Sequence, residues 1–297
     1  YLTYTPRTDR DLHLVAGKIP WVVGTWGARS SPDRQPLVGV PLMYQLPTRL
    51  PSDAIVPDAD SLYRIHSDGT GSNYAGSGES EGMRIVQDAW WDMGAALTGS
   101  RRPLELALGV TSGTPGAPSP GRDTNGAKCV LGRLGVAPLP GVRAGLSGAY
   151  GAYLPAALNA ELPAGHRAED YHQQLVMADA ELLAGHAELR AEGFVNRWET
   201  PTLGSLDARG GYLEGKLTVA PGIYAAARYD LMRFSKLHTS AGEPFPWSDD
   251  ADRTEVGLGY RPMRGVVLKT VWQRTTLDDG EEREPHDLVA VQAALAF

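Results

Sequence analysis

The C-terminal segment, residues 287–297, alternates between two kinds of side chain and ends on the aromatic residue Phe297. Counting back by two from that residue, one face carries mainly leucine and valine, and the other carries alanines and Gln292. A period of two over about ten residues is typical of a strand that faces lipid on one side and the inside of a barrel on the other. Similar patterns recur along most of the chain, and they predict a membrane β-barrel.

The composition suits many strands and turns and gives no sign of a membrane-spanning helix. The chain of 297 residues has a net charge of -7 and contains 35 glycines and 22 prolines. It has no apolar run of about eighteen residues, but barrel strands alternate, so their mean hydropathy stays low. A single cysteine, Cys129, excludes an internal disulfide, and we expect neither a metal nor a cofactor. The modest negative charge gives no reason to expect nucleic acid as a partner.

About thirteen strand-like segments are predicted, and the connections between them alternate in length. Short turns alternate with long polar loops, the longest of which is residues 24–82. Barrels of the bacterial outer membrane have short periplasmic turns and long outer loops, so we expect the protein in that membrane. The predicted strands are residues 1–6, 11–23, 83–99, 103–113, 127–138, 141–153, 170–184, 186–199, 209–220, 223–236, 253–262, 265–276 and 286–297.

An odd number of strands does not suit a single-chain bacterial barrel. Residues 1–6 would run toward the periplasm, so we expect at least one more strand and a complete barrel of about fourteen to sixteen. The sequence shows no secretory signal at its start, so we expect it to be mature or N-terminally incomplete. The predicted fold is all-β: one antiparallel transmembrane β-barrel domain over residues 1–297, enclosing water, with a long loop inserted at 24–82.

Charged side chains on one face of the strands define the predicted lumen. In residues 186–199, Glu188 and Glu192 share one face and Leu189 lies on the other, so a shift by one residue would place charges in lipid. An Arg or Lys at the bilayer midplane costs about 2–4 kcal/mol, which decides the face that points inward. By this argument nine acids and seven bases are predicted to line the pore: Asp92, Glu105, Asp179, Glu181, Glu188, Glu192, Glu214, Asp230 and Glu255, and Arg133, Arg143, Arg190, Lys216, Arg228, Arg261 and Lys269.

A wall of mixed sign suits water and small solutes, and it contains no single-sign series that would make a channel strongly selective. An alternative is that many of these charges pair across strands and only hydrate the wall. On the opposite face, aromatic residues could form girdles at the membrane interfaces. The candidates are Trp91, Tyr229, Trp272 and Phe297.

The loop at residues 24–82 is too long for a simple connection between strands. Its first part, residues 29–51, contains prolines and apolar stretches, whereas residues 68–82 are rich in Gly and Ser. Two interpretations remain open. The loop either folds into the lumen and narrows it, which we favour for residues 29–66, or it is a mobile extracellular loop. Its aspartates lack the spacing of a calcium-binding loop and are interpreted as solvated charges.

Five short features of the sequence are Gly17-Lys-Ile-Pro20, Trp90-Trp-Asp-Met-Gly94, Gly132-Arg-Leu-Gly135, Gly259-Tyr-Arg-Pro262 and the terminal Phe297. In these features the chain resembles bacterial outer-membrane porins, most nearly the barrels grouped with phosphate-selective porins. The resemblance implies a passive channel in contact with outer-membrane lipid, and a homotrimer. Phosphate selectivity is not implied, because the predicted lining lacks a concentrated set of inward Lys or Arg.

The leading hypothesis for function is therefore a porin that lets small solutes or ions diffuse through the outer membrane. A second hypothesis is a structural or conduit barrel that sheathes a partner protein such as a cytochrome. A barrel enzyme is less expected, since the histidines lie mostly in loops or turns and no Gly-x-Ser-x-Gly elbow is present. No catalytic residue is predicted.

Overall fold

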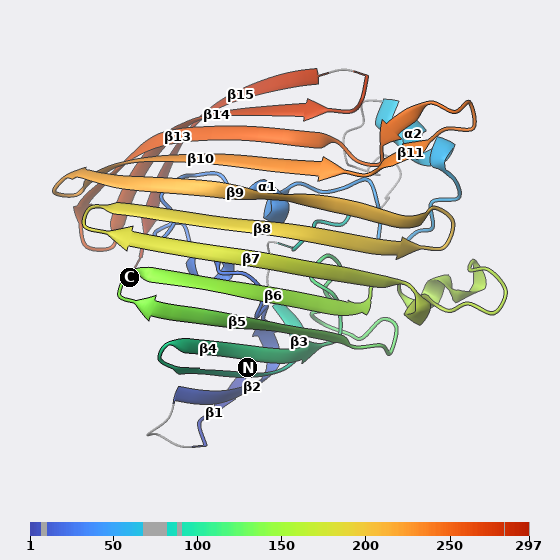
Figure 1. The fold of residues 1–297 in the computed structure, drawn as a ribbon, viewed down its shortest axis with the longest axis horizontal. Helices are drawn as coiled ribbons and strands as arrows, with labels where there is room; N and C mark the ends of the chain where they lie inside the picture. The colour runs from blue at the N-terminus through green and yellow to red at the C-terminus, as the bar shows by residue number, and fades with distance from the viewer. Residues whose placement is uncertain (7–10, 68–81, 88–90, 282, 297) are drawn as a thin grey trace.

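The computed structural model describes residues 1–6, 11–67, 82–87, 91–281 and 283–296. Thirteen strands form one antiparallel sheet, in which neighbours in the sheet are also neighbours along the chain apart from a small excursion between β10 and β13 (Figure 1). The predicted all-β, antiparallel fold is confirmed. The strands are β1 (Leu2–Tyr4), β2 (Asp11–Pro20), β3 (Trp91–Arg101), β4 (Leu104–Thr111), β5 (Cys129–Leu139), β6 (Val142–Ala152), β7 (His172–Ala184), β8 (Ala187–Thr200), β9 (Gly204–Ala220), β10 (Ile223–Phe234), β13 (Asp250–Met263), β14 (Val266–Asp278) and β15 (Arg283–Leu295).

The strand bounds agree with the predicted spans within about three residues, with three exceptions. β9 begins at Gly204, five residues before the predicted start at 209. The span predicted at 83–99 is wrong at its start, because β3 begins at Trp91. Ile85 and Val86 are adjacent and both fully buried, which breaks the period of two that a strand requires. The short strands β11 (Lys236–His238) and β12 (Pro244–Pro246), which pair with each other in the excursion between β10 and β13, were not predicted.

The sheet is open, with β1 and β15 at the two ends of the strand order. Within the described residues no pairing joins these two strands, so closure into a barrel of fourteen to sixteen strands stays a prediction. None of the helices described is long and apolar enough to cross a membrane.

The two faces of the sheet differ in chemistry as the alternation predicts. Leu189, Leu217 and Leu258 are 45%, 50% and 56% exposed, whereas Glu192 and Glu214 on the opposite face are buried. A large surface of exposed aliphatic side chains over neighbouring strands is unfavourable in water and favourable in contact with lipid hydrocarbon. The described candidates for the aromatic girdles, Trp91, Tyr229 and Trp272, are also exposed on this outer face, while Phe297 lies outside the described residues.

Most of the described residues that connect β2 with β3 lie on the inner face of the sheet (Figure 1). We call residues 21–56 together with 82–87 the inner segment. It contains a short 3-10 helix, η1 (Trp26–Arg29), and the one-turn helix α1 (Leu42–Gln45), while α2 (Ala59–Ser67) lies near β11 beyond the strands. Its apolar side chains pack against apolar side chains that point inward from β5 to β13 and form the main hydrophobic cluster.

Candidate functional site

The structure places all sixteen predicted lining residues on the inner face, where they fall into three sets. Seven of them contact the inner segment: Glu192, Glu214, Arg228, Asp230, Glu255, Arg261 and Lys269. Eight form ion pairs on the part of the wall nearer the short turns: Glu105, Arg133, Arg143, Asp179, Glu181, Glu188, Arg190 and Lys216. The last, Asp92, accepts hydrogen bonds from the backbone of Met93 and Gly113.

Glu192 on β8 holds the beginning of the inner segment. Its Oε1 accepts hydrogen bonds from the Thr25 backbone N–H at 2.6 Å, the Thr25 hydroxyl at 2.5 Å and the Trp26 N–H at 2.9 Å. Its Oε2 accepts a hydrogen bond from the Tyr44 hydroxyl. The carboxylate is 3% exposed, so these four donors replace the water that it loses on burial.

Arg228 on β10 lies at the centre of a buried charge cluster. Its guanidinium donates to Asp230 at 2.9 Å, to Glu255 at 2.7 Å and to the Gly39 carbonyl of the inner segment at 2.9 Å, and it lies 3.5 Å from Glu214. The inner segment contributes to the same cluster, because its Arg29 lies 2.7 Å from Glu214. The acids on the wall are thus neutralised partly by a wall residue and partly by the inner segment.

The acids of this cluster also accept backbone hydrogen bonds from the inner segment. Glu255 accepts the N–H of Val38 at 3.2 Å and of Gly39 at 2.8 Å, and Asp230 accepts the N–H of Leu42 at 3.1 Å. Carboxylates that accept backbone N–H groups fix the path of an otherwise irregular chain, since buried peptide groups need partners.

Two bases complete the attachment from β13 and β14. The ammonium of Lys269 donates to the carbonyls of Pro32, Gln35 and Leu37 at 2.7, 3.2 and 3.0 Å, which uses all three of its donors. Arg261 donates to the Asp33 carbonyl at 3.0 Å. Bases on the wall therefore bind carbonyl oxygens of the inner segment, and acids on the wall bind its N–H groups.

The predicted lining residues that do not contact the inner segment form ion pairs across β4 to β9. Arg133 binds both oxygens of Asp179, at 2.9 and 2.6 Å, and also contacts Glu105, which binds Arg143 at 2.6 Å. Acids and bases alternate here, so this part of the wall has little net charge. The pairing agrees with the alternative that cross-strand partners hydrate the wall.

The pattern continues on the next strands toward β9. Arg190 binds Glu181 at 2.7 Å and Glu188 at 2.8 Å, and Lys216 binds the second oxygen of Glu188 at 2.6 Å. These side chains are partly exposed, in contrast to the cluster around Arg228. This region therefore presents paired but solvent-accessible charges.

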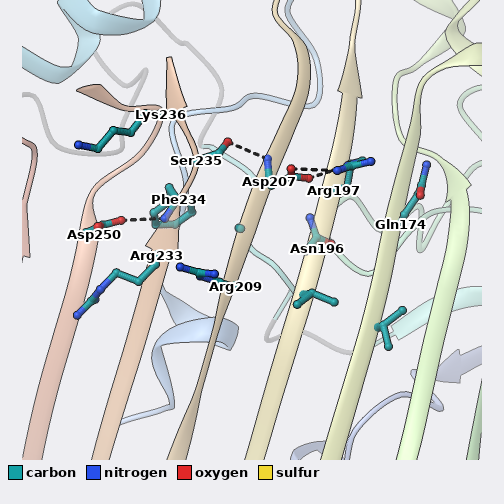
Figure 2. A pocket seen from close by; sticks show the side chains of 13 residues that line it. Gln174, Asn196, Arg197, Asp207, Arg209, Arg233, Phe234, Ser235, Lys236 and Asp250 are labelled. Carbon is teal, nitrogen blue, oxygen red and sulfur yellow. Dashed lines mark hydrogen bonds and ion pairs between the residues drawn. The ribbon is translucent and has the colours of Figure 1, made fainter. Parts of the chain in front are cut away.

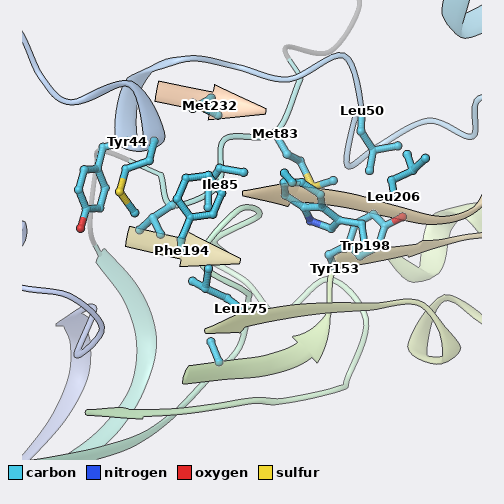
Figure 3. Packing of buried hydrophobic residues seen from close by; sticks show 14 of the residues in the cluster. Tyr44, Leu50, Met83, Ile85, Tyr153, Leu175, Phe194, Trp198, Leu206 and Met232 are labelled. Atoms are coloured by element: carbon cyan, nitrogen blue, oxygen red, sulfur yellow. The ribbon is translucent and has the colours of Figure 1, made fainter. Parts of the chain in front are cut away.

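Sequence reasoning missed the apolar part of the inner wall. Toward the long loops, the inward positions carry large apolar residues, among them Leu175, Phe194 and Trp198, which the inner segment covers with Met83 and Ile85 (Figure 3). The signal was present, since Phe194 and Trp198 have the same parity as Glu192. A lumen that is polar along the whole strand was expected, and this expectation leaves out the apolar residues at inward positions.

The outer end of the inner segment is attached to the long loops. Arg49 forms an ion pair with Asp249, and the hydroxyl of Thr202 donates to the Val56 carbonyl at 2.5 Å. Burial raises the pKa of Asp249, and the adjacent Arg49 guanidinium opposes part of this rise. The part of the chain that the structure describes contains no group of three or more His, Cys, Asp or Glu positioned to hold a metal ion.

Two aspartates of the loop at residues 24–82, Asp58 and Asp60, have hydrogen-bond partners. Asp58 accepts the N–H of Ser61 at 2.7 Å and Asp60 accepts the N–H of Ser240 at 2.8 Å. A hydrogen bond from the Ser61 hydroxyl is the main cause that lowers the pKa of Asp58. Asp68 of the same loop lies outside the described residues.

Solved structures with a similar fold are outer-membrane proteins of bacteria. The chain aligns with the outer-membrane expressed OmpT of Vibrio cholerae at a TM-score of 0.56 and 10% identity, over 96% of this chain and 77% of that one. It aligns with the trimer form of in-vitro folded OmpT at a TM-score of 0.53 and 10% identity, over 95% and 77%. No family model and no curated protein matches the chain. The fold is that of an outer-membrane β-barrel protein, in agreement with the localisation predicted from the strands.

Proposed function

We propose that the protein is a porin-like channel for the passive diffusion of small polar solutes and ions across the bacterial outer membrane. The observation that carries the proposal is the inner segment, held by charged side chains on the inner face of a sheet whose outer face is apolar. An inner segment that is fixed in the lumen narrows the passage but covers only part of the wall. The paired, accessible charges between β4 and β9 then face the space that remains.

Strong ion selectivity is not part of the proposal. Acids and bases alternate along the accessible wall, so no single-sign ring is available to exclude one kind of ion. For the same reason we do not extend the resemblance to phosphate-selective porins into a selectivity for phosphate.

The proposed channel is a single barrel domain over residues 1–297 that assembles as a homotrimer. One of the similar solved structures is described as a trimer form, which is a property of that protein and supports the idea for this one. Light scattering of the detergent-solubilised protein should give three times the monomer mass. A monomer mass would contradict the trimer and leave the channel untouched.

The position of the inner segment favours a channel over a conduit that sheathes a partner. The segment occupies the inner faces of β8, β9, β10, β13 and β14, which a lumenal partner such as a cytochrome would need. We also propose that the protein is not an enzyme. Hydrolysis of lipid or peptide by the purified protein, lost in His172→Ala, would contradict this.

Purified protein refolded into planar bilayers is expected to give stepwise conductance with a reversal potential close to zero in a salt gradient. Lys216→Glu should shift the reversal potential toward cation selectivity, because it adds an acid beside Glu188 on the accessible wall. Arg274→Glu on the outer face is the control and should leave the reversal potential unchanged. Protein that inserts into the bilayer and never conducts would overturn the proposed function.

A further inference from the structure

A cationic groove lies on the outer face of the sheet, at the strand ends that carry the long loops (Figure 2). Its volume is about 800 Å³. The charged side chains that line it are four bases and two acids, which leaves an excess of positive charge. They are Arg197, Arg209, Arg233 and Lys236, with Asp207 and Asp250.

Two of the arginines in this groove face each other across neighbouring strands. Arg209 on β9 is the direct cross-strand partner of Arg233 on β10. Two like charges directly opposite each other on neighbouring strands destabilise a sheet unless a charge of opposite sign lies between or beside them. Arg233 has such a partner, because it binds both oxygens of Asp252 at 2.9 and 2.8 Å.

Arg209 differs from the other arginines of the groove. Arg197 binds both oxygens of Asp207, at 2.6 and 3.0 Å. Arg209 is exposed and has no acidic partner among the residues that the structure describes, and the same holds for Lys236. The groove therefore offers two unneutralised cations next to a paired arginine, which is the arrangement that an anion with several oxygens can bridge.

An apolar groove of about 650 Å³ continues from the cationic one along the outer face. The two grooves share Val176, Val195 and Arg209. The second is bordered by aliphatic and aromatic side chains, and two cross-strand partners in its lining, Gly193 and Gly211, have no side chains. The result is a shallow trough that begins directly beneath the cations.

We propose that the two grooves form one binding site for a phosphorylated glycolipid of the outer leaflet. Its phosphate would bind Arg209, with Arg233 and Lys236 beside it, and an acyl chain would lie in the trough over Gly193. A phosphate headgroup supplies the missing negative charge, and only an amphiphile fills both grooves. The inference depends on the outer face contacting lipid and is independent of whether the protein conducts.

Binding is tested with detergent-solubilised protein and lipid A, a phosphorylated glycolipid, by native mass spectrometry and by the shift in thermal midpoint. We expect lipid A to bind the natural protein and raise its midpoint, and the same lipid without phosphates to bind at least about tenfold more weakly, as loss of a charge-assisted hydrogen bond implies. Arg209→Gln should weaken lipid A binding by a similar factor. Arg274→Gln, an outer-face arginine paired with Asp287 away from the groove, is the matched control and should bind normally.

A second variant tests the acyl chain separately. A Cβ atom added at Gly193 would lie 3.6 Å from its nearest neighbour, the Gly210 carbonyl oxygen, so the Cβ atom of Gly193→Leu fits without a clash and its side chain begins on the face of the trough. The partner Gly211 is unsuitable, because its Cβ would lie 2.2 Å from the Glu192 carbonyl oxygen. Gly193→Leu should weaken binding of lipid A.

Three results would overturn the proposed lipid site. The first is equal binding of phosphorylated and dephosphorylated lipid, and the second is unchanged lipid A binding in both Arg209→Gln and Gly193→Leu. The third is inorganic phosphate competing with lipid A at equal concentration, which would make the ligand a free anion. Lost conductance with intact lipid binding would instead contradict only the proposed channel.

Discussion

Replacing Arg228 by methionine is expected to lower the free energy of unfolding by about 3–5 kcal/mol. The guanidinium is buried, and it binds Asp230 and Glu255 while contacting Glu214. Without it, carboxylates that are themselves almost inaccessible to water lose their shared cation, and Arg29 reaches only one of them. The cost comes from leaving buried charge uncompensated, more than from the attraction that is lost.

The measurement is urea unfolding of the detergent-solubilised protein, followed by tryptophan fluorescence, with the thermal midpoint as a second readout. Arg274→Met is the matched control, since Arg274 pairs with Asp287 on the exposed outer face, where such a pair contributes about 0–1 kcal/mol. Arg228→Lys keeps the charge and should fall between the two. Equal stability losses in Arg228→Met and Arg274→Met would show that the buried cluster is not held by this side chain.

The faces of the strands could be predicted because they depend only on neighbours in the sequence. Glu188, Arg190 and Glu192 alternate with apolar residues, so a single choice of register fixes the inward side of β8, and the structure agrees. The number of strands in the main sheet follows from the same local pattern. The start of β3 could not be found in this way, because Met83, Ile85 and Val86 are apolar for a different reason, namely their packing against the inner face of the sheet.

The role of the inward charges could not be predicted, because it depends on residues far away in the sequence. Glu192 has the pattern of any pore-lining acid, and nothing near it in the chain shows that it accepts hydrogen bonds from Thr25 and Trp26. Lys269 likewise binds carbonyl groups of an irregular segment, which have no signature in the sequence. Sequence alone therefore left open whether residues 24–82 fold inward, and only the contacts distinguish a docked segment from a mobile loop.

Glu192→Ala is expected to detach the beginning of the inner segment while the sheet stays folded. The substitution removes the carboxylate that accepts hydrogen bonds from the Thr25 and Trp26 N–H groups and from the Thr25 hydroxyl, together with one hydrogen bond of Tyr44. Each buried donor without a partner costs about 1–3 kcal/mol. The segment avoids this cost if it opens locally and lets water bind these groups, which requires no change in the strand pairing.

Cys129 is a natural reporter for this opening. It is the only cysteine of the chain, it is 1% exposed, and it belongs to the same hydrophobic cluster as Trp26 and Tyr44. A thiol reagent should therefore react slowly with the natural protein and at least about tenfold faster with Glu192→Ala. A decrease of about 1.4 kcal/mol in the free energy of local opening is enough for a factor of ten. Channel conductance should rise in the same variant, because the passage is no longer narrowed by a fixed segment.

Glu199→Ala is the matched control on the same strand. Glu199 points to the outer face, where it binds His172 and Gln174 and has no hydrogen bond to the inner segment among the described contacts. Its loss should leave the labelling rate of Cys129 unchanged, and Glu192→Gln, which keeps one acceptor oxygen, should give an intermediate rate. If Cys129 reacts as slowly in folded Glu192→Ala as in the natural protein, Glu192 is not the residue that holds the segment in place, and the attachment must reside in the Arg228 cluster and Lys269.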